Sequence, residues 1–208
     1  MPSRLLVRDL KENSYYHIYN QGREGRKLFI DSDDYLKFLD YLFIYTAAID
    51  KVRLKYPKLP KRLADKNLSG QVYLIAYGLF EDHFHILLKQ KSSTAMPALL
   101  KQVTNAYVTY YNKKYSKKGS PFVGRYKSVR IESEYILTQV VRFVHLNPSF
   151  LGVPRDFKNY QWSSYKNNNL TVGILNRFSN FEEYEKFHLD EKSYKDNFEK
   201  IKKLTIDS

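Results

Sequence analysis

The chain has 208 residues with a hydrophobic fraction of 43%, which suits one sizeable packed domain rather than two. Its formal net charge of +13 makes a polyanion such as nucleic acid the natural partner. The absence of cysteine excludes disulfides and thiolate metal ligands. No stretch reaches the roughly 18 apolar residues of a membrane helix, and the N-terminus lacks a signal-peptide core, so we expect a cytoplasmic protein with no membrane partner.

The first third of the chain predicts a strand, a helix and a loop. Aromatic and β-branched residues predict a strand over residues 14–21. Asp31 is a plausible N-cap for a helix, because apolar residues recur at helical spacing after it. Residues 51–70 contain two prolines and repeated lysine and arginine, and we interpret them as an exposed basic loop.

The middle of the chain predicts two further strands and a helix. Residues 71–79 and 83–89 are expected to be strands separated by a short acidic turn. A helix capped by Ser93 or Thr94 should run to about Lys114.

One more strand and helix are expected before the sequence loses its periodicity. The strand covers residues 125–131, and the helix begins after Ser133 and is ended by Pro148. The order βαββαβ predicts an α+β, ferredoxin-like sandwich with an antiparallel central sheet. We assign it to residues 1–170 and expect residues 171–208 to form a helical C-terminal extension.

Two histidines separated by one residue are the first candidate for chemistry. On a strand, His83 and His85 point to the same face while Phe84 faces the core. That geometry suits a metal ion, but strand histidines are commonly only hydrogen-bonded. The pair therefore needs a third ligand before it counts as a metal site.

Five segments, in this order, resemble the single-tyrosine HUH transposases, and among them the REP-associated tyrosine transposase branch: YHIYNQGREGRKLF, the HFH of FEDHFHILLK, GSPFVGRYKS, VVRFVHLNP and QWSSY. The resemblance covers about residues 15–165. It implies that His83 and His85 hold Mg²⁺ or Mn²⁺, with Asn147 as the third ligand. Asn147 lies four residues after the position of the family's nucleophilic tyrosine, and residues so spaced share a helix face.

That nucleophile position is Phe143, where this chain departs from the family. The tyrosine hydroxyl of the family attacks a DNA phosphorus and forms a 5′-phosphotyrosine link, which a phenyl ring cannot do. Phe143 also belongs to an apolar helical stripe typical of a core. Either an engineered substitution or a natural loss of catalysis explains it. Tyr135 is directed elsewhere on the helix and is not a substitute.

Basic residues are placed where a DNA partner could use them. Three cluster at the strand that leads into the Phe143 helix, one adjoins Phe143, and two follow the first strand: Arg125, Lys127, Arg130, Arg142, Arg23 and Arg26.

The leading hypothesis is a transposase-type protein that binds hairpin-bearing single-stranded DNA in the bacterial cytoplasm, associated with the nucleoid. With tyrosine at position 143, it would cleave and rejoin that DNA. The alternative is a non-catalytic regulator that binds DNA or RNA hairpins, which Phe143 favours. A phosphodiesterase that uses activated water is a third reading. The sequence is compatible with a monomer or a homodimer.

Overall fold

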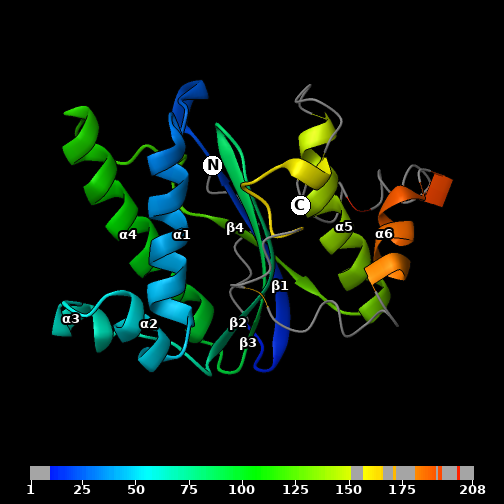
Figure 1. Cartoon of the computed structure of the whole chain (residues 1–208), viewed down its shortest axis with the longest axis horizontal. Coiled ribbons are helices and arrows are strands. Elements are labelled where there is room, and N and C mark those ends of the chain that lie inside the picture. Colours follow the sequence, from blue (N-terminus) through cyan, green and yellow to red (C-terminus); the bar gives the residue numbers. More distant parts are fainter. Residues whose placement is uncertain are drawn as a thin grey trace.

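A four-stranded antiparallel sheet forms the centre of the molecule, with helices on both faces (Figure 1). The computed structural model describes residues 10–150, 157–165, 171, 181–190, 192, 193 and 201. For residues 147–150 and 181 it describes only the backbone. The strands follow the order β2-β3-β1-β4. Their bounds are β1 Ser14–Gln21, β2 Val72–Leu79, β3 His83–Gln90 and β4 Lys127–Ile131.

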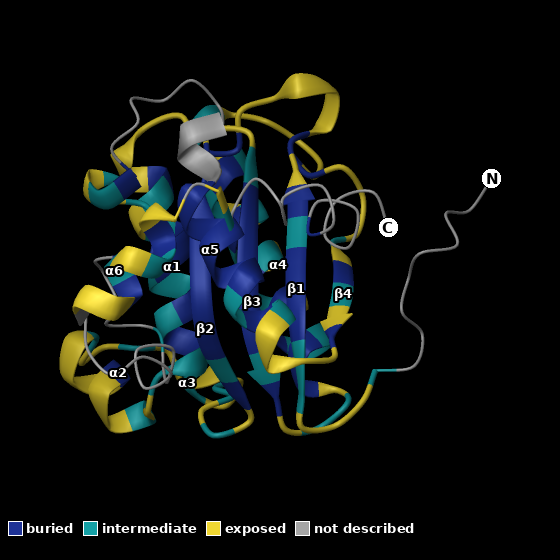
Figure 2. Cartoon of the chain, turned by 90° about the vertical axis from the view of Figure 1, so that its right-hand side faces the viewer, coloured by how far each residue is buried: buried dark blue, intermediate teal, exposed yellow. Residues whose placement is uncertain are grey.

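The helices divide between the two faces of the sheet. Helices α1 (Ser32–Thr46) and α4 (Ala95–Tyr115) cover one face, and α5 (Glu134–Phe150) covers the other, with α6 (Phe181–Leu189) outside it (Figure 1). Figure 2 shows that β2 and β3 are buried along most of their length, whereas the edge strand β4 carries exposed residues. None of the helices in the described part of the chain is long and apolar enough to cross a membrane.

Strand alternation sends side chains into two separate cores. Tyr16, Ile18 and Phe84 belong to the core under α1 and α4, while Leu87 and Ile131 belong to the core under α5. A register shift between Leu74 and Ala76 inserts one residue into β2. Such a bulge bends the strand and increases its local twist.

The predicted ferredoxin-like α+β sandwich is confirmed, and two details of the prediction are corrected. Residues 51–70 are not a plain loop, because they contain parts of α2 (Ile49–Lys55) and α3 (Lys61–Ala64), anchored by the buried Val52. Helix α5 continues through Pro148 to Phe150. A proline in the last turn removes a single backbone hydrogen bond, so the helix need not stop there.

A buried carboxylate ties α1 to the end of α4. Asp34 is fully buried, and its oxygens accept from Lys114 Nζ at 2.8 Å, Tyr115 Oη at 2.6 Å, Tyr110 Oη at 3.0 Å and Ile30 N at 2.7 Å. Burial by itself raises the pKa of Asp34, but these hydrogen bonds outweigh it and hold the pKa below its ordinary value. The charged form is therefore stabilised by folding.

We expect Asp34→Asn to lower the free energy of unfolding by about 2 kcal/mol, because it removes charge-assisted hydrogen bonds. Folding depresses the pKa of Asp34, so the contribution of its carboxylate to the free energy of unfolding is complete above the ordinary pKa of 3.8. That contribution is lost as the pH falls through the pKa of the folded protein. Urea unfolding at several pH values measures both effects. Asp33→Asn, at an exposed position of the same helix turn, is the matched control. Equal losses of unfolding free energy in the two variants would contradict the account.

Candidate metal and nucleic-acid site

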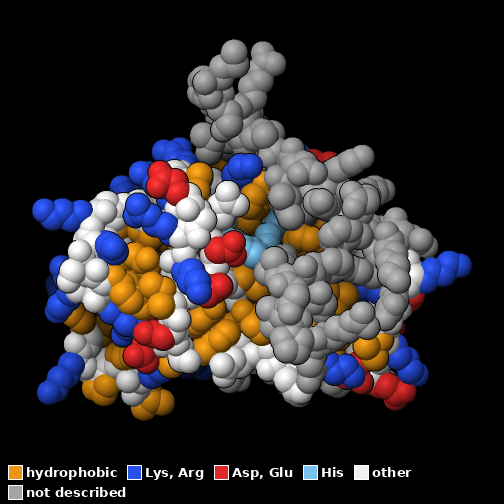
Figure 3. Space-filling view, turned by 90° about the horizontal axis from the view of Figure 1, so that it is seen from above, with side chains coloured by type: hydrophobic (Ala, Val, Ile, Leu, Met, Phe, Trp, Pro, Cys, Tyr) orange, Lys and Arg blue, Asp and Glu red, His pale blue; other side chains and the backbone are white. Residues whose placement is uncertain are grey.

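His83 and His85 begin strand β3 and face helix α5. Their ring centroids are 5.2 Å apart, and Phe84 between them is buried on the opposite face. The alternation predicted from the sequence is thus observed. The His83 side chain is 18% exposed, whereas His85 is 3% exposed, so the pair reaches from the interior to the surface. Histidine atoms are visible on this face of the molecule, with acidic side chains close by (Figure 3).

The same ring atom of each histidine already has a partner. His83 Nδ1 lies 2.6 Å from Asp82 Oδ1, and His85 Nδ1 lies 2.9 Å from His17 Nε2. No described residue bonds to Nε2 of either ring. Metal-binding histidines commonly use one nitrogen for the ion and the other for an orienting hydrogen bond. The local chemistry therefore fits a divalent ion held through the two Nε2 atoms.

His17, on strand β1, shares a hydrogen bond with His85, so the tautomers of the two rings are linked. Burial lowers the pKa of His17 to about 3, and it lowers the pKa of His85 well below its usual value, so both rings are neutral near pH 7. If His17 Nε2 accepts the hydrogen bond, His85 carries its proton on Nδ1 and offers the Nε2 lone pair. His17 then carries its own proton on Nδ1, a buried atom without a hydrogen-bond partner. A metal on His85 favours this arrangement.

Phe143 packs directly against His85 and His17. Its ring meets those of His85 and His17 edge to face, with centroid separations of 5.4 Å and 6.2 Å. A Cβ added at Gly78, opposite His85 on β2, would lie 3.0 Å from the Val144 carbonyl oxygen of α5. Glycine is therefore what lets α5 approach the sheet here. The position singled out by family resemblance therefore lies beside His85.

Asn147 lies one turn beyond Phe143 on α5, and its side chain is outside the described residues. Among the described residues, no three histidine, cysteine or acidic side chains gather as a metal cluster. The predicted ligand set of His83, His85 and Asn147 therefore stays a prediction.

A row of side chains crosses the sheet from the histidines toward its edge. Tyr19 on β1 pairs in register with His85 on one side and Lys127 on the other. The Tyr19 ring centroid is 6.0 Å from that of His85, and Lys127 Nζ is 5.4 Å from the Tyr19 ring centre. The row combines an imidazole, an aromatic ring and an exposed cation. Sequence reasoning missed Tyr19, because only strand register reveals its two neighbours.

The other predicted basic residues do not form one patch with Lys127. Arg130 lies opposite Tyr16, on the α1 and α4 side of the sheet, and pairs with Glu132. Arg125 is exposed near the same side, while Arg23 and Arg26 are exposed beyond the end of β1. These cations occupy both sides of the sheet edge.

Arg142 requires a correction, because it is completely buried and no phosphate can reach it in this structure. Its guanidinium donates to the Asp190 carbonyl and to Ser193 Oγ, and lies 5.0 Å from the centre of the Phe187 ring. It therefore joins α5 to α6. Sequence adjacency to Phe143 was misleading, since neighbouring residues of a helix point in different directions.

Comparisons with known proteins support the fold. No protein-family model and no curated protein matches the sequence. Among solved structures, the chain is similar to a REP-associated tyrosine transposase bound to a REP hairpin, with a TM-score of 0.53 and 14% identity over 85% of this chain and 96% of that one. The two proteins share a fold, as the family resemblance implies.

Two other solved structures are more distant. One is a protein of Deinococcus radiodurans R1 named as a transposase, with a TM-score of 0.38 and 14% identity over 67% of this chain and 94% of that one. The other is tRNA(His) guanylyltransferase from Saccharomyces cerevisiae, with a TM-score of 0.40 and 12% identity over 91% of this chain and 76% of that one.

His17 generates a prediction about metal affinity. We expect His17→Phe to weaken Mn²⁺ binding by about 10- to 100-fold, because His85 loses its orienting partner. His17→Gln, which retains a hydrogen-bonding group, should lose less. Calorimetric titration with Mn²⁺ measures the affinity, with Tyr16→Phe on the same strand as the control. Unchanged affinity in His17→Phe would show that His17 only fills space.

Proposed function

We propose that this chain is a transposase-type HUH protein that binds hairpin-bearing single-stranded DNA. The proposal is carried by one observation: position 143 of α5 lies against His85, which forms with His83 a pair whose Nδ1 atoms both have orienting partners. The relative with the same fold was solved with a REP hairpin, which supports a DNA hairpin as the partner. The net charge of +13 also supports a polyanionic ligand.

The proposed site would hold Mg²⁺ or Mn²⁺ through Nε2 of His83 and His85 and the side-chain amide of Asn147. Imidazole and amide donors without thiolate suit such an ion. When bound, the ion supplies positive charge that polarises the scissile phosphate. Asp82 and His17 would orient the two imidazoles by the hydrogen bonds described above.

Lys127 and Tyr19 would position the DNA strand beside this site. The exposed ammonium of Lys127 can contact a backbone phosphate, and the half-buried Tyr19 ring offers a face on which an unpaired base can stack. Because both residues lie in register with His85, a strand lying across them would reach the proposed metal ligands.

The chain as it stands would bind DNA without cutting it. A tyrosine at position 143 would place a hydroxyl on the ring next to His85, and its oxygen would attack the phosphorus. The tyrosine hydroxyl would lose its proton, the bond from phosphorus to the 3′ oxygen would break, and that oxygen would take up a proton, leaving a 5′-phosphotyrosine and a free 3′-OH. Phe143 has no oxygen to do this.

A non-catalytic hairpin-binding regulator is the competing function, and Phe143 is the observation that favours it. The phenyl ring is 2% exposed and lies in the apolar core under α5, so it is well packed as it stands. In that function the histidine site would be a remnant or would serve only in binding.

We expect Phe143→Tyr to form a covalent adduct with a 3′-labelled DNA hairpin carrying an unpaired flank in the presence of Mn²⁺. A 3′ label stays on the adduct, because the tyrosine is joined to the 5′ phosphate of the fragment on the 3′ side of the cut. Denaturing gel electrophoresis detects it. The unaltered protein and the double variant Phe143→Tyr/His85→Ala should form none.

One result would contradict cleavage by the Phe143→Tyr protein. If Phe143→Tyr binds the hairpin tightly but forms no adduct, the regulator is favoured and tyrosine is not the only group that catalysis lacks.

A further inference from the structure

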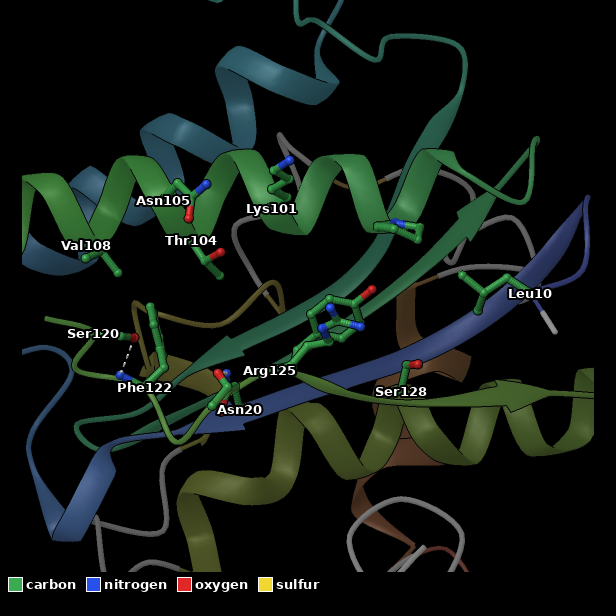
Figure 4. Close-up of a pocket in the computed structure, with 13 residues that line it drawn as sticks. Leu10, Asn20, Lys101, Thr104, Asn105, Val108, Ser120, Phe122, Arg125 and Ser128 are labelled. Atoms are coloured by element: carbon green, nitrogen blue, oxygen red, sulfur yellow. Dashed lines mark hydrogen bonds between the residues drawn. The ribbon is translucent and has the colours of Figure 1, made fainter. Parts of the chain in front are cut away.

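The histidine pair lies on the opposite face of the sheet from an open groove. The groove has a volume of about 880 Å³ and runs between α4 and the edge strands β1 and β4, with Lys101 and Arg125 among its lining residues (Figure 4). Its lining contains neither His83 nor His85. The surroundings that orient the two histidine rings are therefore on the α5 side, where aromatic residues pack around them.

Phe80, in the turn between β2 and β3, packs against both histidines. Its ring is stacked on that of His83, with centroids 4.7 Å apart and an interplanar angle of 25°. It also meets the His85 ring edge to face, at a centroid separation of 6.1 Å. Phe80 is 2% exposed, and a Cβ added at Gly78 would lie 2.8 Å from its Cζ atom. Such close packing leaves the Phe80 ring little room to move, so it restricts the rotation of His83 in turn.

The Phe80 ring is itself stacked on Tyr160, in the segment that follows α5. The two rings are almost parallel, at 8°, and their centroids are 5.7 Å apart. The Tyr160 hydroxyl donates to the Leu79 carbonyl at 2.6 Å, which holds its ring at the end of β2. His83, Phe80 and Tyr160 therefore form a series of stacked rings that starts at a proposed metal ligand.

The segment that carries Tyr160 is attached along the outer edge of β2. Leu79 N donates to the Trp162 carbonyl at 3.0 Å, and Ser163 forms a β-bridge with Gly78. Backbone pairing on one side of Tyr160 and the bond of its own hydroxyl thus keep the ring against the turn between β2 and β3.

His83 depends on these ring contacts more than His85 does. Asp82 bonds to His83 Nδ1 at 2.6 Å, but its side chain is 58% exposed, so water competes for this hydrogen bond. His85 is bonded instead to the fully buried His17. A metal-binding imidazole needs a fixed ring plane as well as a fixed tautomer. For His83, the stacked rings are the buried groups that can fix the plane.

We propose that Phe80 and Tyr160 are positioning residues of the histidine site, which hold the His83 ring so that its Nε2 atom is directed at the ion. This inference rests on the proposed metal site, but not on cleavage or on a DNA partner. It gives the segment after α5 a part in the site, although that segment supplies no proposed ligand.

The test compares two variants that each remove one aromatic ring from the same segment. Tyr160→Leu removes the ring stacked on Phe80, whereas Trp162→Leu removes a ring stacked on Tyr35 instead. In calorimetric titration, Tyr160→Leu should bind Mn²⁺ about tenfold more weakly than Trp162→Leu, because His83 loses its support. Tyr160→Phe keeps the stacked ring and should recover most of the affinity.

A second measurement follows His83 in the absence of metal. The chain has five histidines, so comparison with His83→Ala identifies the His83 ring signals in an NMR spectrum of the histidine side chains. The ring current of Phe80 displaces these signals. Tyr160→Leu should move them toward the values of an unstacked histidine, whereas Trp162→Leu should leave them in place.

Two results would overturn the positioning role while the metal site stands: equal Mn²⁺ affinities in Tyr160→Leu and Trp162→Leu, or His83 signals that do not differ between these variants. Failure of the metal site itself looks different. The unaltered protein would then bind no Mn²⁺, or would bind it no more tightly than His83→Ala, and the positioning role would fall with the site. Failure of Phe143→Tyr to form an adduct would count against cleavage alone.

Discussion

The approach of helix α5 to the sheet is the constraint on which the site depends. Gly78 is the reason that the helix can lie so close, since any side chain there would meet the Val144 carbonyl and the Phe80 ring. The approach brings Phe143 into ring contact with His85 and His17 and seals their inner edges from water. A more distant helix would leave position 143 unable to act on anything bound at the histidines.

Side-chain hydrogen bonds also hold the outer side of α5 in place. His145 Nδ1 lies 3.1 Å from His188 Nε2 of α6, and His145 Nε2 lies 2.8 Å from Ser164 Oγ. Burial lowers the pKa of both histidines, that of His188 to about 4, so the contact between them is between neutral rings. Together with buried Arg142, these bonds clamp α5 between the sheet and α6. Ser164 and His145 have the composition of a catalytic serine–histidine pair, but both are buried and their contact is structural.

The sequence was informative wherever one local rule decided the outcome. Period-two alternation predicts that His83 and His85 share a face, and Asp31 is recognisable as an N-cap before the helix is seen. Prediction from the sequence failed where a contact depends on how segments far apart in the chain align. The contact of His17 with His85 depends on how β1 aligns with β3, and the burial of Arg142 depends on a helix about forty residues later. The split of the basic residues between two faces follows likewise from pairing, and charge counting cannot reveal it.

The most direct measurement is the anomalous diffraction of a crystal of the protein grown or soaked with Mn²⁺. The account predicts a single strong peak within bonding distance of Nε2 of both His83 and His85, beside the ring of Phe143, with the bond from His85 Nδ1 to His17 intact. A peak bound elsewhere, or rings rotated so that the Nδ1 atoms face the ion, would contradict it.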